Sequence, residues 1–193
     1  MIKVLLIHPG ATEYDEQHRI QGTLGIPLSP EGREEVRQSM VSLASAGMEV
    51  IYTAPCMAAT ETAEMIGEAL DLKVKVLDKL RNLNLGLWQG MLVEEVRTKQ
   101  PKVYRQWQEH PDNICPPEGE MLDSARQRME KSLEKLTRKH KADTIGLVVP
   151  EPLASLVRAY FSASDEHLGD LWKPAATGTW EPLSPVSAAE VSK

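Results

Sequence analysis

Short apolar runs alternate with amphipathic stretches along most of this 193-residue chain, and this alternation limits its fold more than any other feature. Short runs rich in branched apolar residues predict buried strands, and apolar residues at helical spacing predict helices that cover them. Strands are expected at Ile2–Ile7, Glu49–Thr53, Lys73–Leu77 and Thr144–Val149. Helices are expected from Pro30 (capped by Ser29) to near Gly47, at Met57–Leu70, from after Pro116-Pro117 to about Lys139, and at Glu151–Phe161.

This order of elements predicts an α/β protein, a three-layer α/β/α sandwich with a mainly parallel sheet. In such a sheet the functional crevice lies beyond the carboxyl ends of the strands. Loops and short helices are expected between Arg81 and Cys115. From Pro174 onward the chain is rich in Ala, Ser, Thr and Pro, so we expect one domain over residues 1–183 and a flexible tail over residues 184–193.

Charge and cysteine content narrow the functional classes. The 28 acidic residues outnumber the 22 basic ones, and the net charge of −6 disfavours nucleic acid as a partner. The apolar run Val4–Ile7 is too short for a signal peptide or a membrane span. Cys56 and Cys115 are too few for a disulfide framework or a zinc cluster and suggest a reducing compartment. We therefore expect a cytoplasmic protein that makes no membrane contact.

No metal or cofactor is expected, because Asp15 and Glu16 form no metal-ligand pattern with a nearby histidine. The expected partner is a small molecule or another protein, and a homodimer is left open.

Several segments follow the expected strand ends or border the crevice. They are His8–Glu13, Arg19-Ile20-Gln21-Gly22, Pro27–Gly32, Ala54–Ala63, Leu80–Gly90, Pro117–Glu120 and Val148–Pro152. Together, and in consistent order over residues 2–183, they resemble the motifs of the histidine phosphatase superfamily, whose fold is phosphoglycerate-mutase-like. The resemblance therefore implies the same α/β fold.

The resemblance also implies five chemical positions in the crevice. Members of the family use a nucleophilic histidine that takes up a phosphoryl group, two arginines and a second histidine that bind the phosphate, and a carboxyl group that protonates the leaving oxygen. Gly10, Thr12 and Glu13 fix the register of the first motif, which puts His8 at the position of the first arginine and Pro9 at that of the nucleophile. Ala58 stands at the position of the second arginine, Asn82 at that of the acid and Glu151 at that of the second histidine.

None of these five side chains matches the family's chemistry. Pro9 has no side-chain nitrogen that could attack phosphorus, and the Asn82 amide cannot serve as an acid. The loss of two guanidinium groups and the gain of a carboxylate make the charge of the pocket more negative by about three units. Two like charges about 4 Å apart repel by roughly 4 kcal/mol at an effective dielectric near 20. A phosphate dianion is therefore disfavoured, unless Glu151 is neutral or a metal bridges the two.

We interpret the chain as a degenerate, catalytically inactive member of the family, a pseudophosphatase with a binding or regulatory role. The alternative is a hydrolase or phosphatase of altered mechanism that uses Glu151 and His8. A third interpretation is an ordinary phosphatase, since similarity alone would class the chain with phosphoglycerate mutases and phosphatases. The ligand-binding candidates are His8, Thr12, Arg19, Asn82 and Glu151.

Structural roles compete with these functional ones. Strand alternation points His8 away from the face that Pro9 uses, so we expect it to line or border the pocket without acting as a displaced nucleophile. Glu151 fits a carboxylate at a helix N-terminus. Trp88 is expected to pack in the core, and Cys56 to be a buried, inert thiol. We expect the carboxyl ends of the first, second and fourth strands to meet at one crevice that contains Gly10, Ala58 and Glu151.

Overall fold

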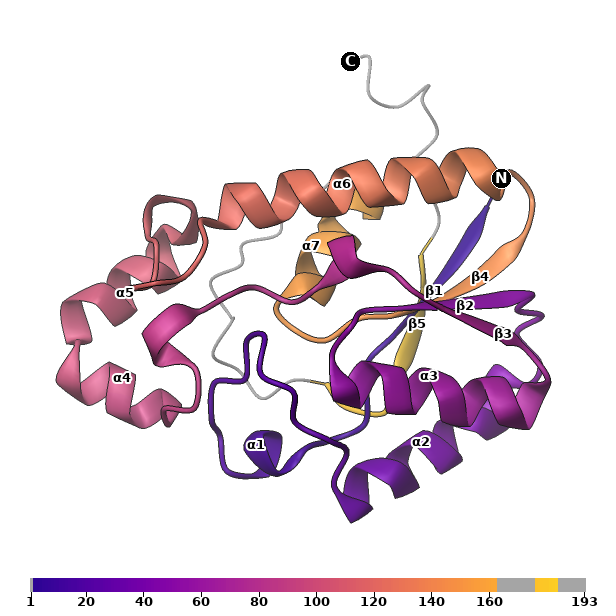
Figure 1. The fold of residues 1–193 in the computed structure, drawn as a ribbon, viewed down its shortest axis with the longest axis horizontal. Helices are drawn as coiled ribbons and strands as arrows, with labels where there is room; N and C mark the ends of the chain where they lie inside the picture. The colour runs from indigo at the N-terminus through magenta and orange to yellow at the C-terminus, as the bar shows by residue number, and fades with distance from the viewer. Residues whose placement is uncertain (1, 163–175, 184–193) are drawn as a thin grey trace.

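The computed structural model describes residues 2–162 and 176–183, and these contain a five-stranded sheet in the order β3-β2-β4-β1-β5 (Figure 1). The strands are β1 (Lys3–Ile7), β2 (Val50–Thr53), β3 (Lys73–Val76), β4 (Thr144–Val148) and β5 (Trp180–Leu183). The first four run parallel to their neighbours, and β5 pairs antiparallel with β1. The predicted mainly parallel α/β sheet is therefore confirmed.

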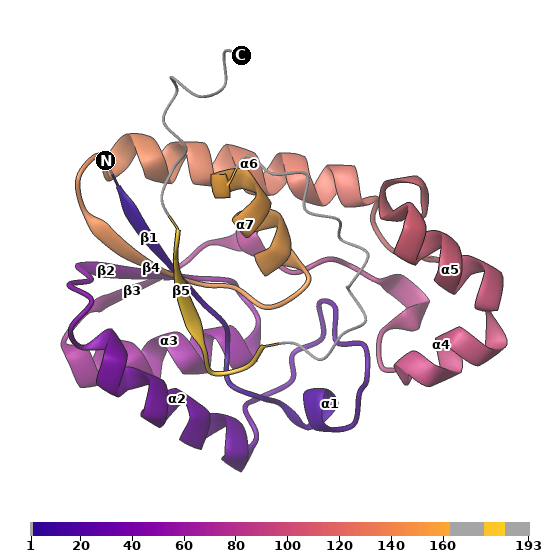
Figure 2. The ribbon, with the colours of Figure 1, turned by 180° about the vertical axis from the view of Figure 1, so that it is seen from behind.

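Helices cover both faces of the sheet, with α2 and α3 on one side and α6 and α7 on the other (Figures 1 and 2). A group of short helices, α1, α4 and α5, extends beyond one end of the strands. The α-helices are α1 (Glu13–Glu16), α2 (Pro30–Leu43), α3 (Met57–Leu70), α4 (Val93–Lys99), α5 (Pro101–Glu109), α6 (Leu122–Lys139) and α7 (Leu153–Ser162). None of the helices in the described ranges is long and apolar enough to cross a membrane.

The start of α2 shows how local sequence fixes an element. The Ser29 hydroxyl accepts a hydrogen bond from the backbone N–H of Gly32 at 3.0 Å, and Pro30 occupies the first helical turn, as the sequence predicts. Gly32 also lets the loop after β1 lie directly against the first turn of α2. A Cβ at Gly32 would overlap the backbone of Ala11, and a Cβ at Gly10 would overlap the backbone of Gly32. Both positions therefore require glycine.

The loop region between β3 and α6 is anchored by two tryptophans. Trp88 and Trp107 are each 1% exposed, and their rings meet edge to face with centroids 5.5 Å apart. This contact joins the segment after β3 to α5 and confirms the expected core position of Trp88.

Several predicted ends differ by one or two residues, and two helix ends and one strand differ by more. Helix α2 ends at Leu43, before Gly47. Helix α6 begins at Leu122 and not just after Pro117, because Glu118 has a φ of 60° and the N–H of Gly119 closes a turn onto Pro116. The segment Trp180–Leu183 forms β5, which the sequence analysis did not predict as a strand. The expected tail at 184–193 lies outside the described residues.

Candidate functional site

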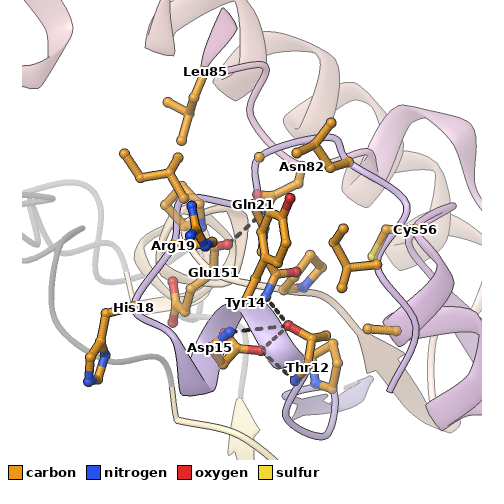
Figure 3. A pocket seen from close by; sticks show the side chains of 18 of the residues that line it. Thr12, Tyr14, Asp15, His18, Arg19, Gln21, Cys56, Asn82, Leu85 and Glu151 are labelled. Carbon is orange, nitrogen blue, oxygen red and sulfur yellow. Dashed lines mark hydrogen bonds between the residues drawn. The ribbon is translucent and has the colours of Figure 1, made fainter. Parts of the chain in front are cut away.

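A cavity of about 350 Å³ opens at the carboxyl ends of β1, β2 and β4 (Figure 3). Residues from α1, from the segment 18–26, from α4 and α5, and from the turns after the strands line it. Gly10, Ala58 and Glu151 all lie on its wall, as predicted. The topology therefore brings together three loops that are far apart in the sequence.

Of the five positions that the resemblance implies for catalysis, four line this cavity: Pro9, Ala58, Asn82 and Glu151. Two further ligand-binding candidates, Thr12 and Arg19, line it as well. His8 is not among the lining residues. It lies behind the wall, where it borders the site through Glu151.

His8 follows the last residue of β1 and is 3% exposed. Its Nδ1 atom lies 3.9 Å from Glu151 Oε1, and its Nε2 atom lies 3.6 Å from Glu181 Oε1. Among the described residues, Nδ1 has no hydrogen-bond partner. The imidazole therefore sits between two carboxylates, behind the cavity wall that Pro9 lines.

Glu151 stands at the entrance to α7, after β4, and its side chain is 23% exposed. Its Oε2 atom accepts hydrogen bonds from the backbone N–H of Ser155 at 3.1 Å and from the Ser155 hydroxyl at 2.8 Å. This is the helix N-terminal carboxylate that the sequence favoured, and the helix dipole stabilises it there. The peptide bond between Glu151 and Pro152 is cis.

Arg158 and Glu181 complete a charged group around His8. The Arg158 guanidinium donates to Glu181 Oε1 from two nitrogens, at 2.9 and 2.7 Å, and lies 3.7 Å from Glu151 Oε1. Burial raises the pKa of the Glu181 carboxyl, but hydrogen bonds and charge from Arg158 and His8 outweigh burial and lower it below its ordinary value. This group could not be predicted from the sequence, because it includes Glu181 of β5, a strand that was not predicted.

The Asn82 side chain, 2% exposed, is held by the backbone around it. Its Nδ2 donates to the carbonyl of Glu151 at 2.8 Å, and its Oδ1 accepts from the N–H groups of Leu83 at 2.9 Å and Leu153 at 3.3 Å. The amide thus ties the segment after β3 to the start of α7. This arrangement needs a donor and an acceptor on one side chain, and an ionised carboxylate offers only acceptors.

Thr12 and Arg19 hold the loop on the other side of the cavity (Figure 3). Thr12 caps α1, donating from its hydroxyl to Asp15 Oδ2 at 2.8 Å, and also accepts a hydrogen bond from the Gln21 amide. Arg19 donates to the carbonyl of Gly90 at 2.7 Å and to Gln17 at 2.8 Å. Both candidates thus have structural partners, although each contributes atoms to the pocket wall.

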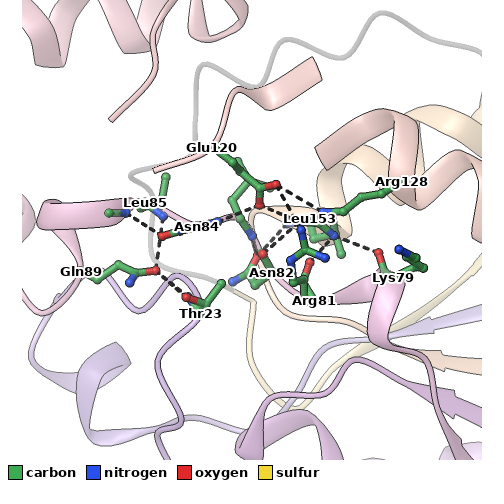
Figure 4. Close-up of polar contacts among 12 residues, drawn as sticks. Thr23, Lys79, Arg81, Asn82, Asn84, Leu85, Gln89, Glu120, Arg128 and Leu153 are labelled. Carbon is green, nitrogen blue, oxygen red and sulfur yellow. Dashed lines mark hydrogen bonds and ion pairs between the residues drawn. The ribbon is translucent and has the colours of Figure 1, made fainter. Parts of the chain in front are cut away.

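A network led by Arg128 supports the segment that carries Asn82 (Figure 4). The Arg128 side chain, 9% exposed, pairs with Glu120 at 2.7 Å and donates to the carbonyls of Lys79, Arg81 and Asn82. Gln89 connects the same segment to the loop after β1, because its Oε1 atom accepts from the N–H groups of Leu85 at 3.3 Å and Thr23 at 2.7 Å. The position of Asn82 is therefore set from α6.

Cysteines and metal ligands add little chemistry. Cys56 lines the cavity, and burial raises the pKa of its thiol against backbone hydrogen bonds that lower it, so the thiol stays protonated, as expected of an inert cysteine. The structure has both Cys56 and Cys115 as free thiols. Within residues 2–162 and 176–183, no group of three or more His, Cys, Asp or Glu side chains could hold a metal ion.

The motif analysis overlooked two aromatic residues of the site. Tyr14 in α1 and Trp107 in α5 both line the cavity. The spacing of Val103 and Trp107, four residues apart, is the feature of the sequence that could have placed Trp107 on the inner face of a helix. Nothing in the local sequence distinguishes Tyr14.

The model of the histidine phosphatase superfamily (branch 1) matches residues 4–176 of this chain. The chain is also 33% identical over 148 residues to phosphoserine phosphatase 1 of Hydrogenobacter thermophilus, an alignment that covers 77% of this chain and 70% of that protein. The chain therefore belongs to the histidine phosphatase superfamily.

Other relatives agree with this assignment. The chain is 28% identical over 168 residues to PhoE of Bacillus subtilis, named an uncharacterized phosphatase, which covers 87% of this chain and 81% of PhoE. It is 29% identical over 164 residues to a bifunctional protein of Mycobacterium tuberculosis, of which it spans only 44%.

Solved structures show the same fold. YhfR of Bacillus stearothermophilus superposes with a TM-score of 0.83 at 23% identity, covering 94% of this chain and 90% of that one. The mycobacterial glucosyl-3-phosphoglycerate phosphatase, solved with VO3, also gives a TM-score of 0.83 at 23% identity, with 94% and 92% covered.

Proposed function

We propose that this protein binds a small molecule in the cavity and does not transfer a phosphoryl group through the family's histidine. The observation that carries the proposal is Pro9, which lines the cavity at the position where the resemblance implies the nucleophile. Proline offers no side-chain nitrogen, so no phosphohistidine can form at that point.

The neighbouring side chains support the same conclusion. Ala58 brings no charge to the wall, and Glu151 brings a carboxylate where phosphate binding requires a donor. The Asn82 amide has no acidic proton to give to a leaving oxygen, and it bonds to three backbone groups. Binding remains as the role of a cavity that the fold still forms.

A phosphoenzyme assay tests this proposal. The protein is incubated with a labelled phosphate donor, and acid-labile phosphate is quantified beside a histidine phosphatase that has its nucleophile. We expect no labelled protein and no turnover of a generic phosphomonoester above background. Stoichiometric phosphohistidine on His8 would contradict the proposal.

A second candidate is a hydrolase of altered mechanism, and the names of the relatives favour it, since phosphoserine phosphatase 1 is named for an activity. The specific observation behind it is the pair of His8 Nδ1 and Glu151 Oε1, 3.9 Å apart at the cavity wall. The test is hydrolysis of para-nitrophenyl phosphate. Activity that is lost in Glu151→Gln but kept in Glu68→Gln would establish this candidate, because Glu68 lies on the exposed face of α3.

The remaining expectations belong to the same proposal. We infer a cytoplasmic protein, in keeping with free thiols at Cys56 and Cys115, that forms one domain over residues 1–183. Its partner is a small molecule or a protein and not a nucleic acid, because the chain is acidic.

A further inference from the structure

We propose that the ligand of this cavity carries a cationic amine on an apolar body, and that Glu151 Oε1, with the unpartnered Nδ1 atom of His8 behind it, binds the amine. The inference rests on the proposed function, because it assumes that the cavity is used for binding. The proposed ligand is a cation, whereas the resemblance to the family implies an anion at this site.

The charged side chains of the cavity wall favour a cation. Among the described lining residues, Asp15, Glu94 and Glu151 are carboxylates, and Arg19 is the one residue with a permanent positive charge. The Arg19 guanidinium is already held by Gly90 and Gln17. A dianion entering this cavity meets repulsion from several sides, whereas an ammonium group is attracted.

Glu151 has one oxygen available for a ligand. Its Oε2 atom is held by Ser155, whereas no described residue donates a hydrogen bond to Oε1. Among the described residues, the nearest cation to Oε1 is Arg158 at 3.7 Å, and that guanidinium donates short hydrogen bonds, at 2.7 and 2.9 Å, to Glu181. An ammonium group at Oε1 would therefore gain a charge-assisted hydrogen bond.

His8 provides a second, independent observation. It is 3% exposed, and its Nδ1 atom has no hydrogen-bond partner among the described residues, although it faces Glu151 Oε1. A buried polar atom without a partner costs free energy that a ligand can recover. In the tautomer with its proton on Nε2, facing Glu181, His8 presents an acceptor at Nδ1. An ammonium group at Glu151 Oε1 would be attracted further by this acceptor behind the wall.

The rest of the cavity suits an apolar body of modest size. Leu24, Ile26 and Leu85 supply aliphatic walls. The ring of Tyr14 also lines the cavity (Figure 3). An aromatic ring near a cation adds further attraction. The volume of about 350 Å³ is in the lower part of the range for small-molecule sites.

Calorimetric titration with three probes of one shape tests the inference: phenethylamine, 2-phenylethanol and phenyl phosphate at pH 7.5. We expect the amine to bind at least about tenfold more tightly than the alcohol, and the phosphate ester not to bind. In Glu151→Gln, which keeps an acceptor for Ser155, the amine should lose at least about tenfold in affinity. Glu68→Gln makes the same charge change on α3, away from the cavity, and should leave amine affinity unchanged.

Ala58→Arg provides a second variant that leaves the contact between Glu151 and Ser155 intact. It places a guanidinium on the cavity wall and should abolish amine binding while the circular dichroism spectrum stays native. Equal binding of amine and alcohol by the natural protein would overturn the inference and leave the proposed function standing. Hydrolysis of phenyl phosphate would instead count against the proposed function itself.

Discussion

Asn82 shows at the scale of one residue how a family position can change its role. The resemblance implies a proton-donating carboxyl group there, but the structure uses the amide as a clamp between two segments. Its donor faces a carbonyl and its acceptor faces two N–H groups, so both ends of the amide are needed. A carboxylate at this position would replace the donor with a second acceptor.

Asn82→Asp should therefore destabilise the protein. The new carboxylate oxygen would face the carbonyl of Glu151 in place of the 2.8 Å hydrogen bond, and we expect the free energy of unfolding to fall by about 1–3 kcal/mol. Urea denaturation measures the change. Asn113→Asp, the same substitution at an exposed position, is the control and should change stability by less than about 0.5 kcal/mol. An equal effect at both positions would contradict the clamp.

Glu181 gives a prediction about pH. Its pKa is lowered in the folded protein, because the effects of Arg158 and His8 outweigh that of burial. The ion pair of Glu181 therefore stabilises the fold fully above the ordinary glutamate pKa of about 4.3. This stabilisation is lost as the pH falls through the lower pKa of the folded protein. Glu181→Gln should lower the melting temperature at pH 7, and the difference from the natural protein should shrink below about pH 4. Thermal denaturation across this range is the measurement. A difference that stays constant down to pH 3 would show that the carboxylate charge is not responsible.

At the scale of elements, α6 acts as a support for the pocket through Arg128. This side chain neutralises Glu120 and satisfies the carbonyls of three residues between Lys79 and Asn82 (Figure 4). The helix therefore fixes the loop that carries Asn82 without touching the cavity.

Arg128→Met should cost about 3 kcal/mol of folding free energy, because the mostly buried Glu120 would lose its 2.7 Å ion pair and, among the described residues, keep only Arg81 at 3.9 Å as a cationic partner. Chemical denaturation gives the loss. Lys131→Met, an exposed change on the same helix, removes the same charge and should be close to neutral. If the two variants unfold alike, the network contributes nothing measurable.

The elements differ in how well the sequence predicts them. Helix α3 was predicted with its exact bounds, because its apolar residues recur at helical spacing and β2 precedes it. Strand β5 was missed, because Pro182 and a length of four residues argue against a strand. Its stability comes from pairing with β1, where Trp180 lies opposite Ile7. Pairing between strands so far apart in the chain leaves no trace in local sequence.

For the molecule as a whole, the motifs predicted which positions surround the cavity, since Pro9, Ala58, Asn82 and Glu151 all line it. They did not predict the contacts of those side chains. The group of His8, Glu151, Arg158 and Glu181 depends on how three elements pack, and no spacing rule in one sequence encodes that.

Restoring all five family residues should recover an anion site before it recovers catalysis. The variant combines His8→Arg, Pro9→His, Ala58→Arg, Asn82→Glu and Glu151→His. Phosphate or vanadate should raise its melting temperature but not that of the natural protein, because binding needs only charge and donors. Hydrolysis should be weak or absent, because turnover needs positions accurate to about 1 Å.

A fourfold variant that keeps Asn82 is the matched control for this experiment. Because it retains the clamp to Glu151 and Leu153, the fourfold protein should start from a higher melting temperature and show a similar shift with phosphate. If the natural protein binds phosphate as tightly as either variant, the electrostatic argument fails, and an anion-binding role for Arg19 becomes the better hypothesis.

The central place of β4 has a consequence for how the chain folds during synthesis. Strand β4 pairs with β1 on one side and β2 on the other, so before it appears the sheet exists only as β1 alone and the β2–β3 pair. At a synthesis rate of roughly 5–20 residues per second, the ribosome needs roughly 7–27 s to pass from β1 to β4. During that interval the apolar strand β1 has no partner in the sheet, so the nascent chain depends on chaperones or on transient burial to keep it from aggregating.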